Sequence, residues 1–320
     1  MRKFLSVITI GSMLMTAAFC GCSQQNQSPP ASGAATANDS KTSSPTSADS
    51  SAYTSAAGSE NSAGSSGKKV RVSDSALGQI WIDELEGVKK NTLNNESFTS
   101  DGTFKYYGEN GNPSSLAGID VSSYNGDINW SSVKNSGVDF VMVRLGGRGY
   151  GEDGTLYQDD HAAEYIKGAQ AAGLKAGGYF FSQAVTNDEA VEEADKVKEI
   201  LGDLKPDFPI AYDWEIIKED EARTDKVSVE QATDCANAFC RQIAAHGYTP
   251  MLYSTSRELY FKYDLSKLAD IDIWYSEYED TPGFYYQFSM WQYSKTGQVD
   301  GIEGTVDLNI CFTDIADYAK

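Results

Sequence analysis

The chain has 320 residues and a formal net charge of -20, with 46 acidic against 26 basic residues. This balance argues against a nucleic acid as partner, because phosphate binding needs a basic stripe and none is visible in the sequence. The chain has only two histidines, His161 and His246, each alone on a helical segment. We therefore expect no metal site, no cofactor and no Ser/His/Asp or Cys/His nucleophile system. We also expect a monomer.

Residues 1–22 predict an export signal. Arg2 and Lys3 precede a largely apolar run that is too short for a spanning helix, and the segment ends in Cys20-Gly21-Cys22. A small residue directly before Cys22 is typical of a bacterial lipoprotein signal. We therefore expect lipid attachment at Cys22 and anchoring to the outer face of the cytoplasmic membrane. An ordinary cleaved signal peptide, which would give a secreted protein, is the alternative.

Two segments of different composition follow the signal. Residues 23–67 are mostly Ser, Ala, Gly, Thr, Asn, Gln and Pro, which cannot bury enough apolar surface to order themselves. They predict a disordered tether. Residues 68–115 carry enough large apolar groups to pack, including Ile80-Trp81-Ile82, but show no clear period. We expect an N-terminal extension packed on the main domain, with a separate small module as the alternative.

From residue 116 to the end, apolar runs that suit strands alternate with helical segments. A helix is expected at residues 160–172, and Thr186 with Glu189 and Ser228 with Gln231 form capping boxes that open two more. This alternation predicts the α/β class and a (β/α) barrel like that of triosephosphate isomerase. Residues 116–320 are fewer than the roughly 250 of a full barrel, so the helices of the C-terminal half should be short or missing. The expected strands are residues 116–120, 140–144, 176–181, 209–215, 251–254, 271–275, 288–293 and 306–312.

The strand at residues 209–215 ends in Asp213 and Glu215, separated by Trp214. The period of two in a strand places both carboxylates on one face. Two carboxylates this close cannot both ionise cheaply, so one pKa should rise and leave a proton donor beside a charged partner. A proton-donating carboxylic acid beside a charged carboxylate is the pair of groups that glycoside hydrolysis uses. Taken alone, the motif also fits two solvated acids at a strand end.

Further candidates lie where strands end, because active residues of such barrels collect at the carboxyl ends of the strands. Asp120 follows the first strand and fits this rule. Asp307 lies near the start of the last strand, and fits only if that strand begins earlier or runs against the others. Aromatic side chains that could stack on sugar rings at the same rim, or pack in the core instead, are Tyr179, Trp274 and Trp291.

Four separated motifs are similar to those of family 25 glycoside hydrolases, the N-acetylmuramidase type of lysozyme. They are Gly118-Ile119-Asp120-Val121-Ser122, Tyr212-Asp213-Trp214-Glu215, Met290-Trp291-Gln292-Tyr293 and Val306-Asp307-Leu308-Asn309, within about residues 116–315. The resemblance implies an irregular barrel whose last strands lack full helices. It also implies hydrolysis of the β-1,4 bond from N-acetylmuramic acid to N-acetylglucosamine in the glycan strands of peptidoglycan.

Site roles follow from the same resemblance. It implies Glu215 as general acid, with Asp213, Asp120 and Asp307 as supporting carboxylates, and a retaining course in which the substrate's N-acetyl group is the nucleophile. It adds Gln292 to the residues expected to bind substrate. Many relatives have a histidine after the tyrosine of the third strand, where this chain has Phe180.

Three other functions stay open. Chitinase-like barrels also carry an acid two residues after an Asp, but their motif has a further Asp where this chain has Ala211. A glucosaminidase would cleave the other bond of the same glycan strand. A barrel that binds cell wall without catalysis is the third alternative, and the intact Asp213 and Glu215 argue against it.

Overall fold

The computed structural model describes residues 65–74, 78–109, 112–218 and 220–312. The expected signal, with Cys22, and nearly all of the expected tether lie outside the described residues. No helix among the described residues is long and apolar enough to cross a membrane.

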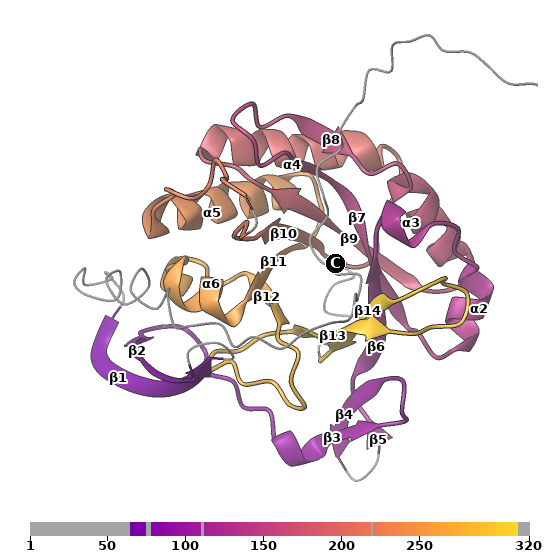
Figure 1. Ribbon diagram of the computed structural model, residues 1–320, viewed down its shortest axis with the longest axis horizontal. Coiled ribbons are helices and arrows are strands. Elements are labelled where there is room, and N and C mark those ends of the chain that lie inside the picture. The colour runs from indigo at the N-terminus through magenta and orange to yellow at the C-terminus, as the bar shows by residue number, and fades with distance from the viewer. Residues whose placement is uncertain (1–64, 75–77, 110–111, 219, 313–320) are drawn as a thin grey trace, which may run out of the picture. The chain divides into compact units, whose positions relative to one another are not determined.

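The main domain is built on one nine-stranded sheet that closes on itself, because β6 pairs with both β7 and β14 (Figure 1). The short β8 is antiparallel to β7 alone, and the other eight strands form the barrel. Each corresponds to one strand expected from the sequence, so the predicted irregular barrel is confirmed. The strands are β6 (Leu116–Val121), β7 (Phe140–Arg148), β8 (Leu156–Gln158), β9 (Lys175–Ser182), β10 (Ile210–Trp214), β11 (Pro250–Thr255), β12 (Asp272–Ser276), β13 (Met290–Gly297) and β14 (Val306–Cys311).

One barrel strand runs against the others. The pairs from β6 through β13 are parallel, whereas β14 is antiparallel to both β13 and β6, and Asp307 pairs with Asp120. Only residues 298–305 connect β13 to β14. A parallel connection needs a dozen or more residues, so this short link has to form a hairpin. The start of β14 therefore lies at the rim where the parallel strands end.

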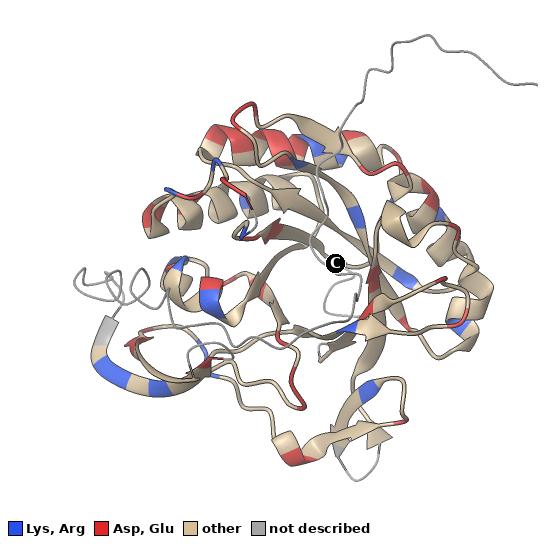
Figure 2. Cartoon of the chain, in the orientation of Figure 1, with Lys and Arg blue, Asp and Glu red and all other residues tan. Residues whose placement is uncertain are grey.

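Helices cover the outside of the barrel in its first half. Thr186 and Ser228 cap two of them by accepting backbone N–H bonds from Glu189 and Gln231, each 3.2 Å long. In place of the reciprocal bonds of the expected capping boxes, the Glu189 carboxylate accepts from the Val185 N–H and the Gln231 amide donates to Asn187. Figure 2 shows that α4 carries many acidic residues, which accounts for part of the net charge. No helix lies between β12 and β13, where every residue is described, so the expected loss of late helices is confirmed. The helices are α2 (Trp130–Asn135), α3 (Ala162–Ala171), α4 (Asn187–Leu201), α5 (Val229–Ala245) and α6 (Ser256–Phe261), with short 3-10 turns η1 (Asn95–Ser97), η2 (Ser123–Asn125) and η3 (Leu265–Lys267).

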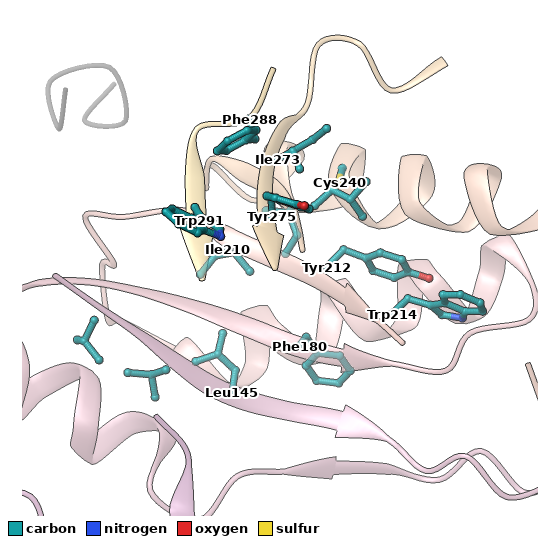
Figure 3. Packing of buried hydrophobic residues seen from close by; sticks show 14 of the residues in the cluster. Leu145, Phe180, Ile210, Tyr212, Trp214, Cys240, Ile273, Tyr275, Phe288 and Trp291 are labelled. Atoms are coloured by element: carbon teal, nitrogen blue, oxygen red, sulfur yellow. The ribbon is translucent and has the colours of Figure 1, made fainter. Parts of the chain in front are cut away.

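Side chains that alternate in direction along each strand divide the core into two layers. Residues such as Met142, Met251 and Met290 form a cluster inside the barrel. The residues between them on the same strands form a second cluster under the helices, shown in Figure 3. Phe180 belongs to this outer layer, so its ring is on the opposite face from Tyr179.

The N-terminal extension (residues 68–115) forms a hairpin and a small three-stranded sheet. The hairpin contains β1 (Ser65–Asp74) and β2 (Gly78–Leu85), and the sheet β3 (Phe98–Ser100), β4 (Lys105–Glu109) and β5 (Asn112–Pro113). Both contact the main domain. The hydroxyl of Tyr285 donates to Glu84 over 2.6 Å, and the Phe98 ring lies 5.6 Å from that of Trp291.

Candidate active site

Asp213 and Glu215 lie at the carboxyl end of β10 and share a hydrogen bond between their carboxyl groups. Asp213 is only 3% exposed, and its Oδ1 has no partner. Burial raises the pKa of Asp213 well above its ordinary value, and the charge of Glu215 raises it further. Burial and then the charge of Glu258 raise the pKa of Glu215 to about 7. The pair therefore holds a proton up to neutral pH.

Asp120, at the end of β6, is held by two side-chain amides. Its Oδ2 accepts from Gln292 Nε2 over 2.9 Å and from Asn309 Nδ2 over 2.8 Å. Burial raises the pKa of Asp120 to about 6, and the two amide hydrogen bonds oppose that rise. Two amide donors thus stabilise the charged form of Asp120.

Asp307 completes the group from the start of β14, opposite Asp120. Its Oδ2 lies 3.3 Å from Gln292 Nε2. Burial, followed by the charges of Asp120 and Glu215, raises the pKa of Asp307 to about 8. The antiparallel direction of β14 is what brings this acid to the rim, so the structure gathers all four acids expected from the sequence.

Gln292 connects this group to the far side of the barrel. Its Oε1 accepts hydroxyl bonds from Tyr253, Ser276 and Tyr278 over 2.9 to 3.0 Å, while its Nε2 donates to Asp120 and Asp307. The side chain is 3% exposed, and both polar atoms are occupied. The expectation that Gln292 binds substrate is therefore corrected, because no polar atom of its amide is free for a sugar. Its contacts fit a positioning residue.

The expected aromatic platforms are not at the surface. Trp274 is 1% exposed, donates from Nε1 to Asn309 Oδ1 over 2.9 Å and packs on Tyr253 and Tyr179. Trp291 is fully buried in the outer layer of the core, on the opposite strand face from Gln292. Neither ring offers a face to a sugar, which corrects both expectations. Tyr179 alone is partly exposed inside the barrel, close to Asp120 and Asp213.

Two exposed tyrosines and an arginine at the site were not identified from the sequence. Tyr124 is 62% and Tyr278 47% exposed, and they follow the ends of β6 and β12 at the same rim. The guanidinium of Arg144 lies 4.9 Å from the Tyr124 ring and pairs with Asp159 over 2.7 Å. For the two tyrosines, the place just after a parallel strand was the available signal, because that rim carries the active residues of such barrels. Arg144 lies within β7.

Comparisons with known proteins agree with this geometry. The model of the glycosyl hydrolases family 25 matches residues 119–302. The autolytic lysozyme of Clostridium acetobutylicum is 28% identical over 196 residues, which are 61% of this chain and 55% of that protein. Lysozyme M1 of Streptomyces globisporus is 28% identical over 206 residues, 61% of this chain and 67% of that protein. The chain thus spans about half the length of the first of these relatives.

The fold also matches solved structures. One is the modular autolysin LytC of Streptococcus pneumoniae in complex with a synthetic peptidoglycan ligand, with a TM-score of 0.54 at 24% identity over 76% of this chain and 56% of that one. This likeness shows the shared fold. Because the family model spans more than half of the chain and includes Asp120, Asp213 and Glu215, the chain belongs to the glycosyl hydrolases of family 25.

Proposed function

We propose that this chain is a peptidoglycan hydrolase of the lysozyme type, which cleaves the β-1,4 bond from N-acetylmuramic acid to N-acetylglucosamine. The observation that carries the proposal is the pair of buried Asp213 and half-buried Glu215, which holds a proton up to neutral pH and faces two further carboxylates. The names of the two lysozyme relatives support the same activity. Proton donor and charge stabiliser in one small volume are what glycoside hydrolysis requires.

In the proposed mechanism Glu215 gives its proton to the glycosidic oxygen as the bond to the anomeric carbon breaks. The acetamido oxygen of the substrate attacks that carbon, guided by Asp213, and forms a cyclic intermediate. Glu215 then takes a proton from the water that opens it, so configuration is retained. Asp120, charged above its pKa of about 6, balances the positive charge that develops on the sugar, and Asp307, with a pKa of about 8, stays protonated beside it.

The first test is a turbidity assay with purified bacterial cell walls as substrate. A hydrolase clears the suspension in proportion to enzyme and time. A barrel that only binds wall would sediment with the wall material and leave the turbidity unchanged, and that result would overturn the proposal.

The pH dependence follows from the pKa values of the site. The donor must be protonated, so kcat/KM should fall as the pH rises through about 7, the pKa of Glu215. Asp120 must be charged to stabilise the developing cation, so kcat/KM should also fall as the pH drops below about 6. The measurement is kcat/KM on a soluble glycan oligosaccharide across this range. A rate that stays flat up to about pH 9 would contradict the assignment of the donor.

We further infer that the enzyme acts from the membrane surface through lipid on Cys22, as the Gly21-Cys22 junction and the polar segment after it suggest. Replacing Cys22 by Ala should move the protein from the membrane fraction to the soluble one without changing its activity on isolated walls. Fractionation followed by immunoblotting measures this. Wild-type protein found in the soluble fraction would exclude the anchor.

A further inference from the structure

A groove of about 1090 Å³ lies between the N-terminal extension and the barrel. Three segments form its walls: the β3–β4 turn at residues 100–105, the segment after β12 at residues 278–280, and the β13–β14 hairpin. Pockets for single small ligands have roughly 300–1,000 Å³. The groove is therefore large enough for several units of an oligomer.

One wall of the groove comes from the N-terminal extension, because the turn at residues 100–105 precedes the matched family region of residues 119–302. Lys105 ties this turn to the barrel. Its ammonium donates to the backbone carbonyls of Glu279 and Asp280 over 2.9 and 2.7 Å, and its backbone N–H donates to the Tyr293 hydroxyl over 3.0 Å. Asp101 accepts two backbone N–H bonds and the Tyr106 hydroxyl bond, which hold the turn in shape.

Tyr278 is common to the groove and to the hydrogen-bond network of the acids. This half-exposed tyrosine lines the groove, and its hydroxyl donates to Oε1 of Gln292 over 3.0 Å. Nε2 of the same amide donates to Asp120 over 2.9 Å. Tyr278 thus marks where a chain bound across the acids would meet the groove.

The lining fits the hydroxyl and amide groups of sugars. Most of its polar side chains are neutral hydroxyls and an amide, which pair with the hydroxyl and acetamido groups of a glycan. Glu279, Asp280 and Asp300 also line it, and their carboxylates can accept hydrogen bonds from sugar hydroxyls. The Lys105 ammonium is already used by two carbonyls. The neutral polar lining residues are Ser100, Thr103, Tyr278, Tyr293, Ser294, Thr296 and Gln298.

We propose that this groove is an extended subsite that holds saccharide units of the glycan strand beyond the cleaved bond. The inference rests on the proposed function, because it assumes a glycan bound across the acids. If the groove holds these units, the enzyme should prefer long glycan strands to short ones. The N-terminal extension contributes to this preference because its β3–β4 turn forms one wall of the groove.

The test compares Thr103→Trp, which places a large ring in the groove, with Thr99→Trp on the same extension. Thr99 is exposed on β3 and does not line the groove, so it is the matched control. The readout is the ratio of kcat/KM on glycan strands freed of stem peptides to kcat/KM on a tetrasaccharide. The ratio should fall about tenfold for Thr103→Trp, equivalent to about 1.4 kcal/mol of binding, and stay at the wild-type value for Thr99→Trp.

Several outcomes would overturn the subsite. Equal ratios for the two variants, or equal losses on both substrates, would mean that the groove does not hold the strand. A loss seen only on walls that keep their stem peptides would assign the groove to peptide. If the wild-type protein cleaves neither substrate, the proposed function fails. Sedimentation with the stripped strands then still tests the groove, since Thr103→Trp must bind them more weakly than Thr99→Trp.

Discussion

Replacing Glu215 by Gln should reduce the rate on peptidoglycan by about 10²- to 10⁴-fold, the usual contribution of a general acid. Gln keeps the shape of the side chain but has no proton to give to the leaving oxygen. The loss should be much smaller on an aryl glycoside whose leaving group departs without protonation. Initial rates on the two substrates measure the difference.

Folding should not suffer from this change. The pKa of Glu215 rises from 4.5 to about 7 on folding, so ionisation of the buried acid disfavours the folded state as the pH increases across that interval. Gln removes this penalty, and the variant should melt at or above the wild-type temperature at pH values above about 7. Glu221→Gln, exposed on the loop after β10, is the matched control and should keep full activity. A Glu215→Gln enzyme close to wild type on peptidoglycan would make Asp120 and Asp307 the candidates for the acid.

Replacing Gln292 by Met should reduce the rate by about 10²-fold, the size of loss that a displacement of 1 Å can cause in an active site. Met has similar length but cannot donate to Asp120 and Asp307 or accept from the three hydroxyls. Several buried polar groups lose a partner, so the free energy of unfolding should fall by about 2–5 kcal/mol. Kinetics and thermal unfolding measure the two effects.

The pH profile separates positioning from a merely structural role for Gln292. The hydrogen bonds from the side-chain amides of Gln292 and Asn309 lower the pKa of Asp120. Loss of the Gln292 amide should therefore move the acid limb of kcat/KM upward from about 6. Gln287→Met, at an exposed position just before β13, should change neither stability nor the limb. An unshifted acid limb in a folded Gln292→Met enzyme would contradict the proposed role.

The barrel could be predicted because its strands show apolar runs bounded by turn residues, and these determine both layers of the core. The place of Asp307 depended on the direction of β14, and the short link at residues 298–305 already favours a hairpin. Trp291 and Gln292 are neighbours on one strand, so they cannot both face the acids. Considering the alternation would have removed Trp291 from the expected binding residues.

Other features of the site could be predicted only in part. The places of Tyr124 and Tyr278 just after strands indicated the rim, but no period gives the direction of a side chain in the 3-10 turn η2 or in the segment after β12. One pKa of the acid pair was expected to rise through the other acid, and this rise falls on Asp213. The rise at Glu215 comes instead from burial and from the charge of Glu258 on α6. An interaction such as that of Glu215 with Glu258 depends on how separate elements pack, and the pattern of residue types along the chain does not predict it.

Mass spectrometry of the reducing ends released from purified peptidoglycan tests the central claim most directly. Digested and undigested wall are reduced with borohydride, and the new ends are identified after hydrolysis to single sugars. Cleavage between N-acetylmuramic acid and N-acetylglucosamine predicts new ends that are reduced muramic acid, produced by the wild-type enzyme and lost in Glu215→Gln. New ends that are reduced glucosamine would make the enzyme a glucosaminidase, and the absence of new ends would contradict hydrolysis of the glycan altogether.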